Sequence, residues 1–147
     1  MNKKKRRLAV VLAAVTGSAV LVLSGCSGKS EQTEKTLRVG VITYSQDDPF
    51  INGLTEELKV QLKAMENKQR RIIVSTKSGN DDQQEQNEKV EEMIDAGCDV
   101  LCINLVDRTA PSRIVRMARN EDIPVIFFNR EPVREDLMQW EKLYYVG

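Results

Sequence analysis

From residue 37 onward, short continuous runs of apolar residues alternate with longer segments in which apolar residues recur every three or four positions. The continuous runs are rich in β-branched residues and are bounded by polar turns, which is typical of buried strands. They predict strands at residues 37–43, 71–75, 99–105, 124–128 and 144–146. The periodic segments predict amphipathic helices at residues 49–67, at 82–96 and from 109 onward.

This regular alternation predicts an α/β fold, a doubly wound parallel sheet with helices on both faces and right-handed crossovers. We expect the first helix to begin with Asp48 as its N-cap and Pro49 as its first residue. Its inner apolar stripe is expected at Ile51, Leu54, Leu58, Leu62 and Met65.

The second helix is polar for two turns, so we expect it to be exposed at its start and packed only near its end, through Val90, Met93 and Ile94. Gly97 is expected to stop this helix as the residue that follows its C-cap. The polar segment 133–141 is expected to form no more than a helical turn. Because no helix follows the last strand to cover it, we expect the chain to be truncated.

The first 26 residues follow the order of charged, apolar and small residues that is typical of a secretory signal. The apolar run at 8–23 is shorter than the ~20 residues that a membrane-spanning helix needs. Leu23-Ser24-Gly25-Cys26 resembles the lipobox of bacterial lipoproteins, in which the peptide is cut before an acylated cysteine. We therefore expect a signal peptide at 1–25, a lipidated Cys26 and a flexible tether at 26–36. An ordinary cleaved signal or a tethering helix is the alternative.

The charge balance changes once this leader is set aside. The whole chain has 22 basic and 22 acidic residues, and the leader holds five of the basic ones and no acidic one. The remainder therefore carries 17 basic and 22 acidic residues, a net charge of −5. Because phosphate binding requires clustered lysine and arginine, this composition excludes nucleic acid as an expected partner.

The sequence contains no histidine. It therefore lacks the commonest general base, the histidine-dependent nucleophile pairs and the usual zinc and copper ligands. Beyond Cys26, the two cysteines Cys98 and Cys102 have no metal-ligand spacing. We expect two inert buried thiols, with a disulfide as the less favoured alternative.

Candidate chemistry lies in the loops that follow the strands, since ligands of open parallel sheets bind beyond the carboxyl ends of the strands. These loops contain no glycine-rich phosphate-binding motif. They do place the carboxylate of Asp48 near the ring of Phe50, and they add the amides of Asn104 and Asn129. A carboxylate can accept hydrogen bonds from two vicinal hydroxyls, and a ring can cover the apolar face of a pyranose. On spacing alone, a plain helix cap and a core aromatic remain the alternative.

A series of motifs strengthens the sugar-binding interpretation. The chain resembles the amino-terminal part of galactose/glucose-binding proteins, solute receptors of ABC sugar importers within the periplasmic binding protein type I superfamily. The similarity covers about Leu37 to Gly147. It rests on Val39-Gly40-Val41, Asp47-Asp48-Pro49-Phe50, Ile103-Asn104-Leu105-Val106-Asp107, Pro124 to Pro132 with its Phe-Phe-Asn-Arg-Glu-Pro core, and Tyr144-Tyr145-Val146-Gly147.

This resemblance implies one incomplete lobe, residues 37–147, of a two-lobed fold that closes around one monosaccharide. It implies that Asp48 accepts hydrogen bonds from sugar hydroxyls, that Phe50 stacks on one sugar face and that Asn129 binds a ring hydroxyl. Arg130 next door is as readily a solvated charge. Trp140, the only tryptophan, is expected to have a packing role.

The resemblance also implies the partners. We expect a non-enzymatic lipoprotein on the outer face of the cell membrane that binds D-galactose, D-glucose or a methyl galactoside and delivers it to an ABC permease. No cofactor is expected, and calcium would belong to the second lobe. The alternatives are a fragment without appreciable ligand binding and a receptor for another monosaccharide such as ribose.

Overall fold

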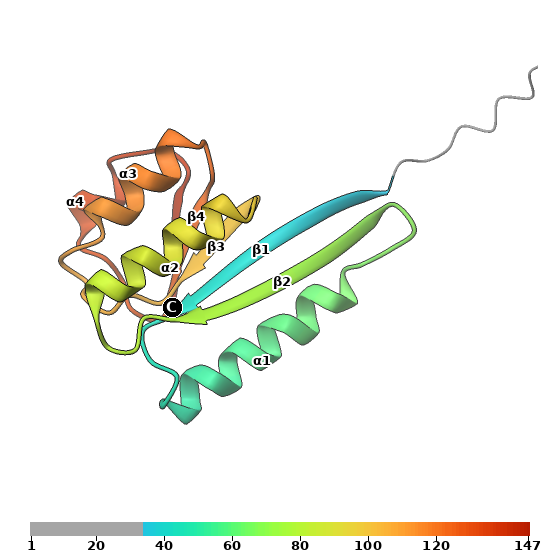
Figure 1. The fold of residues 1–147 in the computed structure, drawn as a ribbon, viewed down its shortest axis with the longest axis horizontal. Helices are drawn as coiled ribbons and strands as arrows, with labels where there is room; N and C mark the ends of the chain where they lie inside the picture. The colour runs from blue at the N-terminus through green and yellow to red at the C-terminus, as the bar shows by residue number, and fades with distance from the viewer. Residues whose placement is uncertain (1–33) are drawn as a thin grey trace, which may run out of the picture. The chain divides into compact units, whose positions relative to one another are not determined.

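The computed structural model describes residues 34–147, which form one five-stranded sheet. All neighbouring strands are parallel, in the order β2-β1-β3-β4-β5 (Figure 1). The strands are β1 (Lys35–Thr43), β2 (Arg70–Ser78), β3 (Val100–Ile103), β4 (Val125–Phe128) and β5 (Leu143–Val146). The predicted parallel α/β fold is thereby confirmed. The predicted signal peptide, Cys26 and the tether as far as residue 33 lie outside the described residues.

Four helices connect the strands: α1 (Pro49–Ala64), α2 (Gln83–Asp95), α3 (Ser112–Asn120) and α4 (Arg134–Leu137). Helices α2 and α3 cover one face of the sheet and α1 lies against the other (Figure 1). The larger core lies under α2 and α3 and includes Val90, Leu101, Ile114, Val125 and Phe127. Between residues 34 and 147, no helix is both long enough and apolar enough to cross a membrane.

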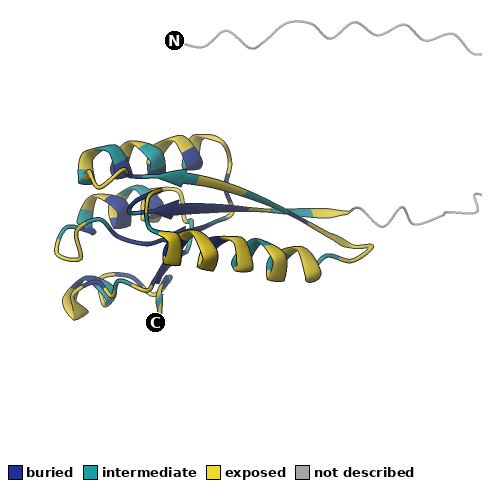
Figure 2. Cartoon of the chain, turned by 90° about the horizontal axis from the view of Figure 1, so that it is seen from below, coloured by how far each residue is buried: buried dark blue, intermediate teal, exposed yellow. Residues whose placement is uncertain are grey.

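Helix α1 begins as predicted, with Asp48 as its N-cap and Pro49 as its first residue. The prediction that its whole apolar stripe is core was wrong. Ile51 is buried, but Leu54 is 39% exposed and Met65 is 54% exposed, and most of α1 is exposed in Figure 2. The cause is geometric: a groove separates the amino-terminal half of α1 from β4 and β5, so Leu54 faces open space instead of a neighbouring element.

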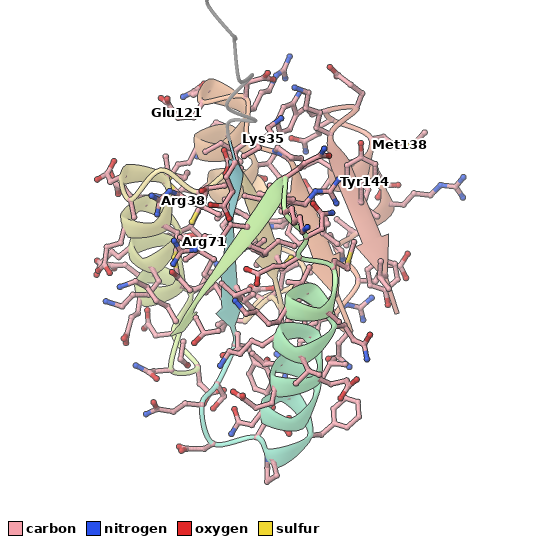
Figure 3. The ribbon with its side chains drawn as sticks, turned by 90° about the vertical axis from the view of Figure 1, so that its right-hand side faces the viewer. Lys35, Arg38, Arg71, Glu121, Met138 and Tyr144 are labelled. Atoms are coloured by element: carbon pink, nitrogen blue, oxygen red, sulfur yellow. The ribbon has the colours of Figure 1, made fainter. Side chains whose placement is uncertain are left out.

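The two longest strands extend beyond their predicted limits. Strand β1 begins at Lys35, and its first two residues pair with Arg70 and Arg71. The last two residues of the predicted tether are thus part of the sheet. Figure 3 shows Lys35, Arg38 and Arg71 together at the amino-terminal end of these strands, away from the loops that follow them.

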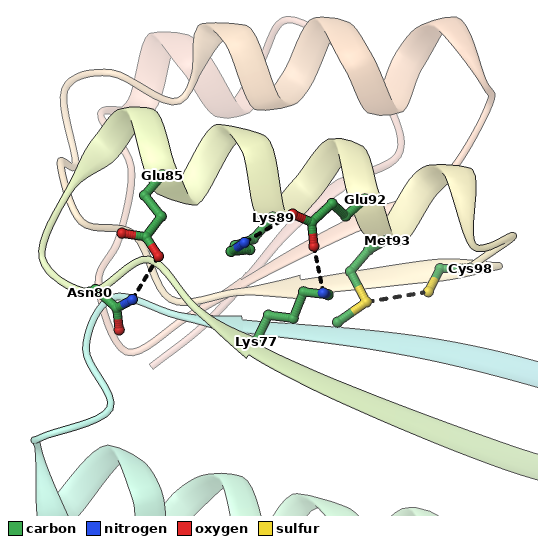
Figure 4. A network of polar contacts seen from close by, with 7 residues as sticks. All are labelled: Lys77, Asn80, Glu85, Lys89, Glu92, Met93 and Cys98. Carbon is green, nitrogen blue, oxygen red and sulfur yellow. Dashed lines mark hydrogen bonds and ion pairs between the residues drawn. The ribbon is translucent and has the colours of Figure 1, made fainter.

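Helix α2 ends as predicted, because Gly97 adopts a φ of +75°. Its N–H donates to the carbonyl of Ile94, and the N–H of Cys98 donates to the carbonyl of Met93, which is the Schellman pattern of hydrogen bonds. Figure 4 shows the Cys98 thiol beside the Met93 sulfur, at 3.9 Å.

The expectation of an exposed start for α2 was wrong, because Gln86 and Asn87 are buried. The Gln86 amide is fully enclosed, and it pairs with main-chain groups of the loop after β3. A polar side chain can be a core residue when it replaces the hydrogen bonds that water would make. The polar sequence of this turn therefore led to a wrong prediction of its burial.

Trp140 is buried and belongs to the core beneath α3, together with Leu137 and Leu143. Its predicted packing role is confirmed. The ammonium of Lys142 lies 5.9 Å from the centre of its ring. The short helical turn predicted within 133–141 is α4.

Candidate functional site

Four segments meet beyond the carboxyl ends of the parallel strands, and we call them the rim: residues 44–50 after β1, which include the first two residues of α1, 79–82 after β2, 104–108 after β3 and 129–131 after β4. Hydrogen bonds join them into one surface. The Gly79 N–H donates to the carbonyl of Thr43, and the Asp81 N–H donates to the carbonyl of Tyr44, both at 2.8 Å. Crossovers that always return the chain to the same end of a parallel sheet bring these loops together.

Asp48 has two roles in this rim. Its Oδ1 accepts from the N–H groups of Phe50 and Ile51, at 2.8 and 3.3 Å, and so caps α1. Its Oδ2 accepts the hydroxyl of Tyr44 at 2.6 Å. The Tyr44 hydroxyl, then the two helix N–H groups and the nearby charge of Arg130 hold the pKa of this carboxyl below its usual value. The contacts that cap α1 therefore also favour the ionised form of the Asp48 carboxyl.

Phe50 occupies the second helical position, and the residue is 66% exposed. It lines what we call the apolar groove, a cavity of about 510 Å³ between α1 and the last two strands. The lining residues are Phe50, Leu54, Leu58, Cys102, Ile126, Phe128, Asn129, Val146 and Gly147. An exposed aromatic ring at the mouth of such a groove is available to stack on a ligand.

Asn129 follows β4 and adopts a left-handed backbone conformation, with a φ of +61°. Its main-chain N–H pairs with the carbonyl of Val146 at 3.0 Å, which fixes it to the edge strand. Its Oδ1 accepts from Nδ2 of Asn104 at 3.2 Å. Asn129 is therefore held at the rim with one side-chain oxygen already engaged, and it lines the same groove as Phe50.

Asn104 is the buried link beneath these groups. Its Nδ2 donates to the main-chain carbonyl of Phe128 and to Asn129, and its Oδ1 accepts the N–H of Tyr44 at 3.4 Å. One amide thus connects the ends of β1, β3 and β4. Sequence analysis placed Asn104 among the ligand candidates, but its burial makes it a support for the rim.

Two rim residues were missed as contributors. Sequence analysis did not single out Tyr44, and it described Arg130 as readily a solvated charge. The guanidinium carbon of Arg130 lies 3.6 Å from the centre of the Tyr44 ring, and that ring carries the hydroxyl bound to Asp48. Their positions directly after β1 and after Asn129 were the only sequence signal for either one.

The structure brings the three predicted ligand residues to one end of the sheet. Asp48 and Phe50 lie two residues apart at the start of α1, and Asn129 shares the groove with Phe50. A continuous series of contacts runs from Asp48 through Tyr44 to Arg130, the neighbour of Asn129. None of the three is buried: Phe50 and Asn129 are exposed, and Asp48 is half-buried.

A second hollow, of about 530 Å³, lies between the carboxyl-terminal half of α1 and β2. It is lined by Lys59, Val60, Lys63, Ala64, Ile72 and Val74. No rim residue contributes to it. The apolar groove, which does include rim residues, is therefore the better candidate site.

Both described cysteines are free and buried. Burial raises the pKa of the Cys102 thiol to about 11, and burial is also the main cause that raises the pKa of Cys98. The expectation of two unbridged, inert thiols agrees with this environment. Over residues 34–147, no three acidic or cysteine side chains gather as a metal site would require.

Comparison with known proteins gives a family match over nearly the whole described sheet. Residues 39–147 match the model of the family described as periplasmic binding protein domain. The D-galactose/methyl-galactoside binding periplasmic protein MglB of Haemophilus influenzae is 33% identical over 110 residues. That match covers 75% of this chain and 32% of the relative, so the chain spans about a third of its length.

Solved structures with the same arrangement include sugar receptors. The fructose-binding periplasmic domain of a hybrid two-component system has a TM-score of 0.60 and 28% identity, covering 76% of this chain and 34% of the other. An ABC transporter solute-binding protein from Clostridium phytofermentans with bound β-D-glucose has a TM-score of 0.61 and 25% identity. It covers 74% of this chain and 31% of the other.

Proposed function

The chain belongs to the periplasmic binding protein domain family, and from this premise we propose that it captures a monosaccharide, D-galactose or D-glucose or a methyl galactoside, for an ABC importer. The observation that carries the proposal is the rim, where an ionised carboxylate lies two residues from an exposed phenylalanine and an amide lines the same groove as that phenylalanine. The relative named for galactose and methyl galactoside, and the neighbour with bound glucose, support this ligand class.

Each rim residue has a distinct part in this proposal. Asp48 accepts a sugar hydroxyl, Phe50 covers one C–H face of the ring, and Asn129 donates from its side-chain nitrogen to a ring oxygen or hydroxyl. Binding is non-covalent and requires no cofactor. Glycoside hydrolysis normally requires a pair of carboxylates, and this set contains only that of Asp48, so capture rather than catalysis is the proposed activity.

The structure modifies one expectation about Asp48. A carboxylate has about four acceptor positions, two on each oxygen. Three are already taken by Phe50, Ile51 and Tyr44. Asp48 therefore has one open position, on Oδ2, and we propose that it accepts one sugar hydroxyl instead of a vicinal pair.

Because the rim residues lie at one end of one sheet, we propose that they cover a sugar from one side only. Ligand sites normally bury about 70–90% of a small ligand, and affinity depends on desolvating both of its faces. For the 147-residue chain by itself we therefore propose weak binding, with a dissociation constant of about millimolar. The alternative is a fragment without appreciable ligand binding, and the observation in its favour is the high exposure of Phe50, which leaves the apolar groove open to solvent.

We further propose that the protein is exported and anchored at the outer face of the cell membrane through Cys26. In this arrangement the tether leads directly into β1, whose first residue is Lys35. The ABC permease is the proposed protein partner. Metabolic labelling with an alkyne fatty acid tests the anchor, because Cys26→Ser should abolish incorporation.

Calorimetry and thermal-shift measurements test the ligand. We expect D-galactose and D-glucose to give a response in the protein and D-ribose to give a weaker one. The matched variants are Asp48→Asn, which keeps a helix-capping side chain, and Asp47→Asn, its exposed neighbour. A response to ribose alone would favour the alternative receptor, and no response to any sugar would contradict the proposal.

A further inference from the structure

The main chain of Tyr44 is held on both sides at the end of β1. Its N–H donates to Oδ1 of Asn104, and its carbonyl accepts the N–H of Asp81 at 2.8 Å. The main-chain atoms that carry the Tyr44 side chain are therefore fixed within the rim. Ser45 is likewise fastened, since its hydroxyl donates to the Asp81 carboxylate at 2.8 Å.

The ring of Tyr44 is fixed by two further contacts. Its hydroxyl donates to Oδ2 of Asp48, and the guanidinium of Arg130 lies over its face. Nη1 of Arg130 donates to the carbonyls of Leu105 and Val106, at 3.2 and 3.1 Å, at the end of β3. A guanidinium that is tied to main-chain oxygens and stacked on a ring holds that ring in one orientation.

These contacts leave few acceptor positions for a ligand. With Oδ1 occupied by two helix N–H groups, the open position of Asp48 lies on Oδ2, beside the phenol. A tyrosine oxygen that donates one hydrogen bond can still accept another. Two acceptor positions, one on a charged oxygen and one on a neutral oxygen, are therefore left open on two atoms that are 2.6 Å apart.

We propose that Tyr44 and Arg130 are positioning residues that fix Asp48 with a single open acceptor, and that the Tyr44 oxygen accepts a second hydroxyl of the same ligand. This inference rests on the proposed function and deepens it. Under this proposal, ligand selection depends on two sugar hydroxyls, one that donates to Asp48 and one that donates to Tyr44. If the Asp48 carboxylate rotated freely, it could accept either hydroxyl and would not distinguish between the two.

The electrostatics around Tyr44 agree with this geometry. The charged groups that face it are Asp48 from the start of α1, Asp81 from the loop after β2 and Arg130 from the loop after β4. The hydrogen bond to Asp48 is the main cause that raises the pKa of the phenol, and Arg130 opposes it. The phenol thus stays protonated and donating at neutral pH, while Asp48 stays ionised.

The first experiment measures the Asp48 carboxyl by carbon-detected NMR during an acid titration of the full chain without sugar. Tyr44→Phe should raise the Asp48 pKa, because the largest cause of its depression is removed. Arg130→Met should raise it less, and Arg130→Lys, which restores the charge, should recover part of the wild-type value. An unchanged Asp48 pKa in both Tyr44→Phe and Arg130→Met would overturn the positioning role.

The second experiment follows sugar binding by NMR titration with D-galactose and its 3-, 4- and 6-deoxy analogues. Losing one neutral hydrogen bond should weaken galactose binding about 2- to 10-fold in Tyr44→Phe. One deoxy analogue should bind wild type and Tyr44→Phe equally, because the hydroxyl that Tyr44 reads is already missing. Equal losses for all analogues would overturn the second acceptor.

The positioning role of Tyr44 and the proposed sugar binding can fail separately. If wild type binds galactose but Tyr44→Phe changes neither the Asp48 pKa nor the pH at which binding is lost, the positioning role is wrong and the proposed function stands. If wild type binds no sugar while the Asp48 pKa shifts as expected, the proposed function fails, and the ligand-reading role of Tyr44 fails with it.

Discussion

Nε2 of Gln86, in the first turn of α2, donates a 2.9 Å hydrogen bond to the main-chain carbonyl of Asn104 at the end of β3. Its Oε1 accepts the N–H of Val106 at 3.0 Å. A single enclosed amide therefore satisfies a donor and an acceptor of the loop that supports the rim. Asn104 in turn connects this loop to Tyr44 and Asn129.

Replacing Gln86 should destabilise the fold. Gln86→Leu keeps the approximate volume but leaves the Asn104 carbonyl and the Val106 N–H unpaired, and each unsatisfied buried group costs about 1–3 kcal/mol. We expect the free energy of unfolding, measured by chemical denaturation, to fall by about 2–4 kcal/mol. Gln84→Leu, on the exposed side of the same helix, is the control, and an equal loss in both variants would contradict this account.

Two glycines should respond in opposite directions to alanine. Gly97 has a φ of +75°, where a Cβ is strained, so Gly97→Ala should cost about 1–2 kcal/mol. Gly53 lies inside α1 with open space where a Cβ would stand, so Gly53→Ala should stabilise by about 1 kcal/mol. Thermal unfolding compares the two, and a midpoint shift of the same sign in both would show that the backbone argument is wrong.

Glu92 should contribute to the acid limb of stability. The hydrogen bonds with Lys77 and then Lys89 lower its pKa from 4.5 to about 2 (Figure 4). Because the folded value is the lower one, its stabilisation is complete above about pH 4.5 and is lost as the pH falls towards 2. Glu92→Gln should flatten the stability profile in that window, more at low salt than at high salt.

The control for this titration is Glu91→Gln, which removes an exposed carboxylate from the same helix. It should leave the slope closer to that of wild type. A Glu92→Gln profile that overlays the wild-type profile between pH 4.5 and 2 would mean that the half-buried Lys77 and Lys89 do not lower the pKa of Glu92 in solution.

The thiols should be slow to react in the folded protein. In a Cys26→Ser background only Cys98 and Cys102 remain, and both are free and buried. Since the thiolate is the reactive form and the pKa of Cys102 is raised to about 11, labelling near neutral pH should be slow until denaturant is added. Rapid labelling of Cys102 in native protein would contradict the burial of this thiol beside the apolar groove.

Much of the fold follows from local pattern. Continuous apolar runs predicted all five strands, and Asp48, Pro49 and Gly97 marked helix boundaries because capping and left-handed backbone depend on residue type. Burial was harder to predict. Its spacing predicts that Leu54 is a core residue. Its exposure, however, depends on which element covers β4 and β5, and the spacing of apolar residues in α1 does not determine that element.

The candidate site shows the same division. Topology marked the segments that hold Asp48, Phe50 and Asn129, because they lie beyond the carboxyl ends of strands, and the resemblance to galactose/glucose-binding proteins implied the role of each residue. The stack of Arg130 on Tyr44 joins residues 86 positions apart in the sequence and depends on side-chain rotamers. Gln86 was misjudged for a related reason, since its partners are main-chain atoms of a distant loop.

The most direct test of the central claim is an amide NMR titration of the 147-residue chain with D-galactose, recorded in parallel for Asp48→Asn and Asp47→Asn. The account predicts saturable shifts confined to the rim, around Phe50, Asn104 and Asn129, at about millimolar sugar. These shifts should persist in Asp47→Asn and disappear in Asp48→Asn. Shifts that lie elsewhere, or that survive unchanged in Asp48→Asn, would contradict it.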